Sequence, residues 1–338
     1  MSKELLKIND LKVSFFTPAG EVKAVNGISY TLEPGKVLGI VGESGSGKSV
    51  SSYSIMGLID NPGKIVGGSI IFDGKDVSTM TKSERQNLAG NEIAMIFQDP
   101  MTCLNPVFTI GNQIAESLIH KYGRKISKKE IKERSIDLLK LVGINEPEKR
   151  LAQYPHEFSG GMRQRVMIAM ALAGSPKLLI ADEPTTALDV TIQAQILELL
   201  KDIQKKTGMA IILITHDLGI VADMADDIIV MYAGKIVEQG SVYSIFNNPR
   251  HPYTKGLLRS LPDLNKKGEK LIPIQGNPID LLNLPQGCAF APRCENCMKV
   301  CLKYAPKEYS IEDGHTVSCW LYDGMANNST EVKNNDKH

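Results

Sequence analysis

The feature that most constrains this chain is the segment Gly42-Glu-Ser-Gly-Ser-Gly-Lys48-Ser49, which matches the phosphate-binding pattern G-x-x-x-x-G-K-S. Residues 37–41 before it are typical of a buried strand, and residues 50–58 after it are typical of the first turns of a helix. Such a loop turns its backbone N–H groups toward one point, where the helix dipole also favours negative charge. We predict that Lys48 reaches the β- and γ-phosphates of a nucleotide and that Ser49 is a ligand of Mg²⁺. The residues expected to bind the nucleotide here are Gly42, Ser44, Gly45, Ser46, Gly47, Lys48, Ser49 and Val50.

Composition excludes several classes of protein. Lys and Arg number 39 against 38 Asp and Glu, for a net charge of +1, so no strong field points to nucleic acid or to an anionic surface. No apolar run approaches the roughly 20 residues that a membrane helix needs. The N-terminus lacks the apolar stretch of a signal peptide. We therefore expect a soluble, cytoplasmic chain whose contact with a membrane comes through partners.

Strand and helix patterns alternate along the chain, which predicts an α/β fold with a mostly parallel sheet covered on both faces. The alternating segments 8–16 and 22–32 predict an antiparallel hairpin. Further strands are expected at 65–72, 92–97, 178–181 and 210–215, and helices at 114–121, 128–142, 161–174 and 190–205. We expect a core of 1–99 and 176–245, an inserted helical subdomain of 100–175, a cysteine-rich extension of 246–322 and a disordered tail of 323–338.

A second motif places two carboxylates after an apolar strand. Residues 178–181 are apolar and are followed by Asp182 and Glu183. The C-terminal edge of such a strand lies beside the phosphate loop, where open α/β sheets bind ligands. Asp182 suits the Mg²⁺ shell, and Glu183 suits a general base or an orienter of the attacking water. Alone, this pattern equally fits a solvated strand end, but together with the phosphate loop it indicates nucleotide hydrolysis.

Residues 158–164, Phe-Ser159-Gly160-Gly161-Met162-Arg-Gln, identify the family. The chain resembles the ATP-binding subunits of ABC transporters, whose signature reads L-S-G-G-Q, and the other motifs follow in the family's order. The resemblance covers about residues 5–240 and implies a P-loop ABC ATPase core, with an antiparallel β subdomain and the inserted helical subdomain. Met162 departs from the commoner glutamine, whereas Ser159, Gly160 and Gly161 are intact.

The resemblance implies roles for residues outside these motifs. Gln98 matches the Q-loop glutamine, which serves catalysis and the Mg²⁺ site, and residues 187–189 match the D-loop with Asp189. His216 matches the switch histidine at the γ-phosphate, because it follows the strand expected at 210–215; a lone histidine would more often be structural. Phe15 is the candidate for stacking on adenine, with Phe16 as the alternative.

The signature itself has a physical meaning. Ser-Gly-Gly at the start of a helix presents N–H donors and the positive end of a dipole to phosphate. In the resembling family two subunits pack head to tail, so that Ser159, Gly160 and Gly161 of one chain close over the nucleotide held by the other. The resemblance thus implies an ATP-driven dimer that hydrolyses ATP with Mg²⁺.

The segment 248–258 (N-P-R-H-P-Y-T-K-G-L-L) resembles the one that follows the ATPase core in dipeptide and oligopeptide importer subunits. This implies an ATPase that energises peptide uptake at the cytoplasmic face of the membrane. Its partners would be a second, different ATPase subunit, two transmembrane permeases and an extracytoplasmic solute-binding protein. Alternatives are the same role for nickel or another small solute, or a soluble ABC-type ATPase acting on ribosomes or DNA. The latter usually has two cassettes or a long coiled-coil insertion, and neither is present.

Five of the six cysteines follow residue 287. In a cytosolic chain, clustered cysteines indicate metal or redox chemistry more often than disulfides, and four thiolates bind zinc or an iron–sulfur cluster. The resembling subunits carry C-x5-C-x6-C and a later cysteine as a [4Fe–4S] site, which implies Cys288, Cys294, Cys301 and Cys319. Spacing leaves open Cys297 in place of Cys301, zinc in place of iron, and unligated thiols. A zinc module for nucleic acid is disfavoured, since no basic, aromatic-interleaved patch accompanies it.

Overall fold

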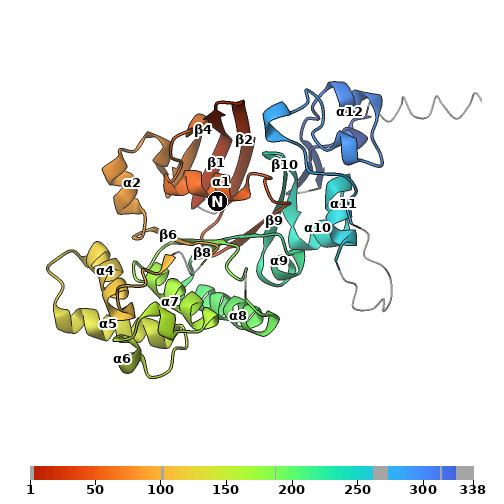
Figure 1. Ribbon diagram of the computed structural model, residues 1–338. Coiled ribbons are helices and arrows are strands. Elements are labelled where there is room, and N and C mark those ends of the chain that lie inside the picture. The colour runs from red at the N-terminus through yellow and green to blue at the C-terminus, as the bar shows by residue number, and fades with distance from the viewer. Residues whose placement is uncertain (1–3, 100–102, 187, 262–272, 313, 325–338) are drawn as a thin grey trace, which may run out of the picture.

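The computed structural model describes residues 4–99, 103–186, 188–261, 273–312 and 314–324. Two β-sheets lie together on one side of the molecule, and a group of helices lies below them in Figure 1. The predicted α/β fold is confirmed. In the part of the chain that is described, no helix combines the length and the apolar character needed to cross a membrane.

A small antiparallel sheet is built on the N-terminal hairpin. Its strands run in the order β2-β1-β4-β5, and β1 pairs with both β2 and β4. Ile8, Leu11 and Val13 of β1 are buried in one apolar cluster, and a register shift between Ile8 and Leu11 interrupts the alternation of the strand. The predicted hairpin is therefore confirmed. The strands of this sheet are β1 (Leu6–Thr17), β2 (Gly20–Leu32), β4 (Gly63–Phe72) and β5 (Lys75–Asp76).

The larger sheet carries the phosphate loop. Its order is β11-β12-β10-β9-β3-β8-β7-β6, and the five strands from β9 to β6 are parallel to their neighbours in that run. Every residue of β3, β7 and β8 is buried, which explains their almost entirely apolar sequences. Because the strands are parallel, the residues that follow β3, β6, β7 and β8 meet at one edge. The parallel strands are β3 (Val37–Val41), β6 (Ile93–Ile96), β7 (Leu178–Asp182), β8 (Ala210–Thr215) and β9 (Asp227–Tyr232).

Alternate residues of the buried strands point to two different layers. Leu179 and Leu213 pack with helices α7 and α8, whereas Ile180 and Ile212 pack with the antiparallel sheet and with Ile55 of α1. The larger sheet is thus covered by helices on one face and by the smaller sheet with α1 on the other. The helices of this part are α1 (Lys48–Met56), α2 (Lys82–Leu88), α8 (Val190–Thr207) and α9 (Leu218–Met224).

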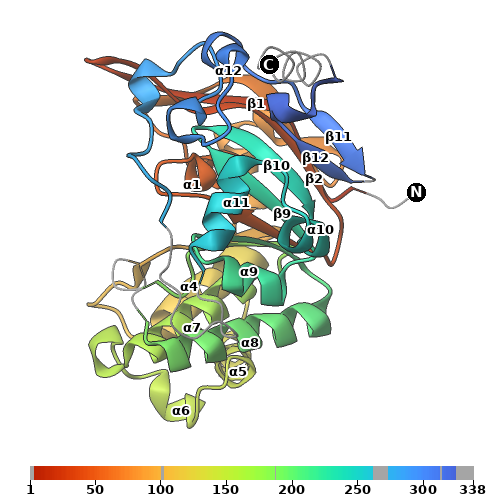
Figure 2. The ribbon, with the colours of Figure 1, turned by 90° about the vertical axis from the view of Figure 1, so that its right-hand side faces the viewer.

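The residues between β6 and β7 form the helical group seen at the bottom of Figures 1 and 2. Ile110, Ile114 and Leu118 are buried together with Leu139, so α4 and α5 pack through one apolar stripe each. The helices predicted here are confirmed, although α4 begins four residues earlier than expected, where Thr109 accepts a hydrogen bond from Asn112 N. The members are α4 (Ile110–Tyr122), α5 (Lys128–Leu141), α6 (Pro147–Arg150) and α7 (Gly160–Leu172).

The C-terminal residues extend the larger sheet, which the sequence did not predict. Strand β12 pairs with β10 through Val317 and Glu238, and Figure 2 shows β11 and β12 beside β10. The division into a core of 1–99 and 176–245, an insert of 100–175 and an extension of 246–322 stays a prediction. The remaining elements are β10 (Lys235–Ser241), α10 (Val242–Asn247), α11 (Pro252–Arg259), α12 (Lys299–Lys303), β11 (Tyr309–Glu312) and β12 (His315–Val317).

Glu238 joins the core to this extension. Its fully buried carboxylate accepts hydrogen bonds from the backbone N–H groups of Arg250 (2.6 Å) and His251 (2.8 Å) and from Nε2 of His315 (2.9 Å). A buried carboxylate needs such donors to offset its lost hydration. The segments that carry Arg250, His251 and His315 are therefore fixed to β10. The tail expected to be disordered lies outside the described residues from 325 onward.

Candidate functional site

The phosphate loop joins β3 to α1 as predicted. Gly42 (φ 151°) and Gly47 (φ 99°) adopt backbone angles that side chains disfavour, and a Cβ at either would lie within 2.3 Å of a carbonyl oxygen, of Met231 or of Ala24. Lys48 Nζ donates to the carbonyl oxygens of Gly42 (2.7 Å) and Glu43 (3.0 Å). The loop is therefore folded around its own lysine.

Two polar groups of this loop, the Ser46 hydroxyl and the Lys48 ammonium, are buried in a way that favours an incoming anion. Ser46 Oγ is buried and has no hydrogen-bond partner among the described residues. Lys48 is 6% exposed; burial lowers its pKa, and the carboxylates of Glu183, Asp182 and Glu43 oppose that shift. A buried ammonium that rests on neutral carbonyls gains a counter-charge when a phosphate enters. The loop therefore fits a phosphate group.

The predicted Mg²⁺ ligands lie side by side. Ser49 Oγ donates to Asp182 Oδ1 at 3.1 Å, and Asp182 is buried. Burial raises the pKa of Asp182 and Glu183 adds to the rise, whereas hydrogen bonds from Ser49 and Tyr53 lower it. A divalent cation would stabilise this carboxylate, and hydroxyl and carboxylate oxygens are ligands that Mg²⁺ accepts. The residues present thus fit Mg²⁺ bound together with a nucleotide.

The three predicted catalytic residues meet at the edge of the sheet. Gln98 follows β6, Glu183 follows β7 and His216 follows β8. Gln98 Nε2 donates to Glu183 Oε2 at 2.9 Å, and Thr186 Oγ1 donates to the same oxygen at 2.9 Å. His216 Nδ1 lies 3.3 Å from Glu183 Oε1. The Glu183 carboxylate is therefore held through Oε2, and its Oε1 lies beside the exposed side chain of His216.

Two residues of this site were not predicted from the sequence. Tyr53 lies one helical turn after Ser49 and hydrogen-bonds to Asp182; burial and this carboxylate raise the pKa of Tyr53 to about 12. Thr186 lies three positions after Glu183 and fixes its carboxylate. Residues three or four positions apart share a helix face, so the spacing from Ser49 was a usable signal for Tyr53.

The signature residues lie elsewhere. Ser159 caps α7 by accepting a hydrogen bond from Met162 N (3.4 Å), and Asp189 caps α8 by accepting one from Ile192 N (3.0 Å). Helix α7 packs on the face of the larger sheet opposite to α1, as Figure 1 also shows. The D-loop is predicted at residues 187–189, and residue 187 lies outside the described residues. The nucleotide contacts expected of Ser159, Gly160, Gly161, Asp189 and Val50 stay predictions.

Phe15 and Phe16, the two candidates for stacking on adenine, differ in their burial. Phe15 is half-buried against the apolar cluster of the smaller sheet, and a Cβ at Gly63 would lie 2.7 Å from its ring. Phe16 is 48% exposed, with Lys64 Nζ 6.0 Å from its ring centroid. Stacking by Phe15, with Phe16 as the alternative, stays a prediction.

The cysteines of the extension are free thiols, and the metal site predicted for them is not confirmed. Burial raises the pKa of Cys319 to about 12, with contributions from Cys288, Cys294 and Cys301, so these thiols lie near one another. Within the described ranges, however, no three His, Cys, Asp or Glu side chains are placed to hold a metal ion. Metals bind the thiolate form of cysteine, and burial raises the pKa of Cys288, Cys294 and Cys319. Cys297 is exposed.

Fold and site together define a P-loop ATPase. Two family models match the chain: ABC transporter over residues 25–186, and oligopeptide/dipeptide transporter, C-terminal region, over residues 237–301. The chain belongs to the ATP-binding proteins of ABC transporters.

Named relatives and solved structures agree with this assignment. The chain is 58% identical to the oligopeptide transport ATP-binding protein OppD of Bacillus subtilis, over 94% of this chain and 88% of that protein. It is 52% identical to the dipeptide transport ATP-binding protein DppD of Escherichia coli, over 93% and 96%. Its fold resembles the dimeric post-hydrolysis structure of the ATP-binding cassette MJ0796 bound to ADP and Pi, with a TM-score of 0.63, 27% identity, and coverage of 70% of this chain and 98% of that one.

We expect Glu183→Gln to bind Mg·ATP normally but to lose turnover by about 100-fold or more, the usual contribution of a general base. The phosphate loop and Asp182 are unchanged in this variant, and only the charge facing the water is removed. Thr186→Val is the matched control, because it removes one hydrogen bond to Glu183 and leaves the carboxylate. Its turnover should fall less than that of Glu183→Gln. Near wild-type hydrolysis by Glu183→Gln would exclude Glu183 as the base.

Proposed function

We propose that this chain hydrolyses ATP to energise the uptake of dipeptides or oligopeptides through an ABC importer. The observation that carries the proposal is the meeting of Lys48, the Ser49–Asp182 pair and Glu183 at one edge of the larger sheet. The peptide class is supported by the match of residues 237–301 to a peptide-transporter region and by the names of the relatives.

In the proposed reaction each residue of the site has a role. Lys48 holds the β- and γ-phosphates, and Ser49 with Asp182 would hold Mg²⁺, which when bound neutralises charge on the phosphate oxygens. Glu183 accepts a proton from the attacking water, since Gln98 and Thr186 fix its Oε2 and leave Oε1 toward His216. Binding and positioning supply most of the rate in this reaction class.

The site is proposed to be completed by a second ATPase subunit. Helices α1 and α7 pack on opposite faces of the sheet, so the Ser159-Gly160-Gly161 turn is well placed to serve a nucleotide other than the chain's own. The N–H groups at the start of α7 suit an anion. A solved structure with the same fold is described as dimeric. We infer that ATP joins two such subunits and that hydrolysis releases them.

The other proposed partners are two transmembrane permeases and an extracytoplasmic solute-binding protein, with the chain at the cytoplasmic face of the membrane. This arrangement is supported by membership of the ABC transporter family and by the peptide-transporter region. Nickel or another small solute is the alternative cargo.

Transport can be tested in proteoliposomes that hold this chain, the second ATPase subunit and the two permeases. We expect labelled peptide to accumulate when ATP and the binding protein are present, and Lys48→Ala to abolish uptake because the phosphates lose their cation. Lys205→Ala, in the last turn of α8, is the control and should transport normally. Uptake of Ni²⁺ without peptide would support the alternative cargo, and ATP hydrolysis without any uptake would contradict an importer role.

The composite site can be tested with two substitutions that both preserve the cap of α7. Asp and Asn cap helices as well as Ser does, but only Asp adds a negative charge against the partner's γ-phosphate. We expect Ser159→Asn to form the ATP-bound dimer and Ser159→Asp to stay monomeric in light scattering, with equal ATP affinity of the monomers. Gly161 is less suitable, since a Cβ there would lie 2.6 Å from Ile192 Cγ2. Weaker ATP binding by monomeric Ser159→Asp would mean that the signature serves its own nucleotide.

We also propose that Cys288, Cys294, Cys301 and Cys319 hold a [4Fe–4S] cluster, with zinc as the alternative. The proposal is supported by the mutual effect of these thiols on the pKa of Cys319 and by the exposed position of Cys297. Iron or zinc would convert the thiols to thiolates and bind distant parts of the extension together.

Chain purified without oxygen should then contain about four iron atoms and absorb visible light. Cys301→Ser should remove the iron, and Cys297→Ser should retain it as the matched control. One zinc and no iron would establish the alternative, and loss of iron in Cys297→Ser alone would correct the ligand set. Metal-free protein would leave the cysteines as plain thiols.

A further inference from the structure

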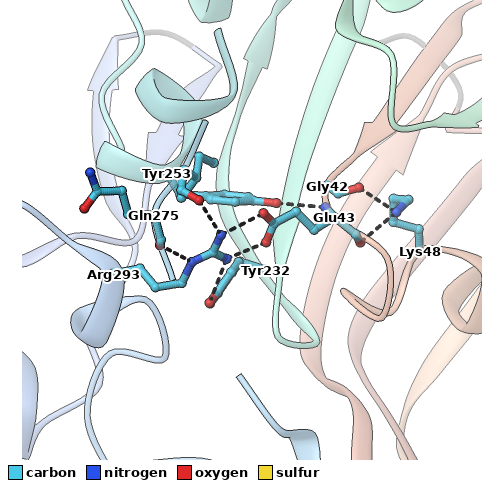
Figure 3. A network of polar contacts seen from close by, with 8 residues as sticks. Gly42, Glu43, Lys48, Tyr232, Tyr253, Gln275 and Arg293 are labelled. Carbon is cyan, nitrogen blue, oxygen red and sulfur yellow. Dashed lines mark hydrogen bonds and ion pairs between the residues drawn. The ribbon is translucent and has the colours of Figure 1, made fainter. Parts of the chain in front are cut away.

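An arginine of the extension is paired with the phosphate loop. Arg293 lies at the end of the short helical turn Ala291–Arg293, and Glu43 is the second residue of the loop. Nη1 and Nη2 of Arg293 lie 2.5 Å and 2.9 Å from the two carboxylate oxygens of Glu43, as Figure 3 shows. Only 5% of the arginine side chain and 26% of the glutamate side chain are exposed. This two-pronged geometry is specific to a guanidinium and a carboxylate.

Besides Glu43, three other groups contact the guanidinium of Arg293. Its Nε donates to the carbonyl oxygen of Gln275 at 3.0 Å and its Nη2 to that of Ile274 at 3.4 Å, while Nη1 lies 3.4 Å from the hydroxyl of Tyr232 (Figure 3). The hydrogen bonds to Glu43, followed by the one to Tyr232, raise the pKa of Arg293. The charge is therefore permanent, and Arg293 has little freedom to move away from the loop.

A second residue of the extension holds the same part of the loop. The hydroxyl of Tyr253, in α11, accepts a hydrogen bond from Glu43 N at 2.8 Å (Figure 3), and the tyrosine is fully buried. The side chain and the backbone N–H of Glu43 are thus both bound by residues more than 200 positions further along the chain.

Glu43 also contacts Lys48 through its backbone. The carbonyl oxygens of Glu43 and its neighbour Gly42 accept the hydrogen bonds of Lys48 Nζ. The backbone that receives the ammonium is therefore the backbone that Arg293 and Tyr253 hold in place. An exposed ion pair would add little, but removing one partner of a buried pair leaves the other charge without compensation.

We propose that Arg293 is a positioning residue for nucleotide binding, which acts through Glu43 on the first half of the phosphate loop and makes the extension a part of the nucleotide site. The inference rests on the proposed ATPase function. It predicts that Arg293 affects the affinity for ATP and leaves the chemical step unchanged, because Glu183, Gln98 and His216 are held by other elements.

The test is a titration of the full-length chain with Mg·ATP, together with kcat and KM. Arg293→Met keeps the apolar stem and removes the charge; we expect Kd and KM to rise about tenfold and kcat to change less than about twofold. Arg259→Met is the matched control, since Arg259 pairs with exposed Glu295 within the extension, at 3.4 Å, and both Kd and KM should stay at wild-type values. The fluorescence of Trp320, the single tryptophan, reports whether the extension is folded.

A double-mutant cycle separates positioning from general damage. Glu43→Gln should weaken ATP binding as Arg293→Met does, and the double variant should be no weaker than the worse single variant, because both remove one interaction. Arg293→Lys keeps the charge but loses the two-pronged geometry, so its Kd for Mg·ATP should lie between those of wild type and Arg293→Met. Unchanged Kd in a folded Arg293→Met chain, or additive losses in the double variant, would overturn the inference. Wild-type chain that fails to bind Mg·ATP would instead refute the proposed function.

Discussion

The burial of the Lys48 ammonium is the constraint on which the rest of the site depends. A charge removed from water needs partners, and here two carbonyl oxygens supply them until a phosphate enters. The loop can curl so tightly only because Gly42 and Gly47 allow close contact with the carbonyl oxygens of Met231 and Ala24. Strand β3, the two glycines and the first turn of α1 therefore form one structural unit that fits a phosphate group.

The parallel sheet explains how residues from four segments reach that unit. Strands β6, β7 and β8 end at the same edge as β3, so Gln98, Glu183 and His216 arrive there without long loops. Their contacts also orient the Glu183 carboxylate, because Gln98 and Thr186 donate to Oε2 while His216 lies beside Oε1. The signature turn has a different place, at the start of α7 on the face of the sheet opposite to α1, which is the observation behind the proposal that it serves a second subunit's nucleotide.

The sequence predicts what is encoded locally. Spacing within the phosphate loop identified Lys48 and Ser49, and the apolar strand before Asp182 placed the carboxylates, because each motif carries its own strand or helix. The contacts of Arg293 and Tyr253 with Glu43 could not be predicted, since no periodicity links residues so far apart in the chain. The same holds for β11 and β12, two short strands that pair with each other and reach the larger sheet through the pairing of β12 with β10. Cysteine spacing names candidate ligands but cannot give their ionisation, which depends on burial.

We infer that the phosphate loop and the C-terminal extension form a single nucleotide site. Hydrogen exchange of the full-length chain, with and without Mg·ATP, tests this inference because exchange reports the stability of each segment separately. ATP should slow exchange in residues 42–50 and, together with them, in residues 252–256 and 286–294. Slower exchange in the loop while both extension segments stay unchanged would show that the extension is not part of the site.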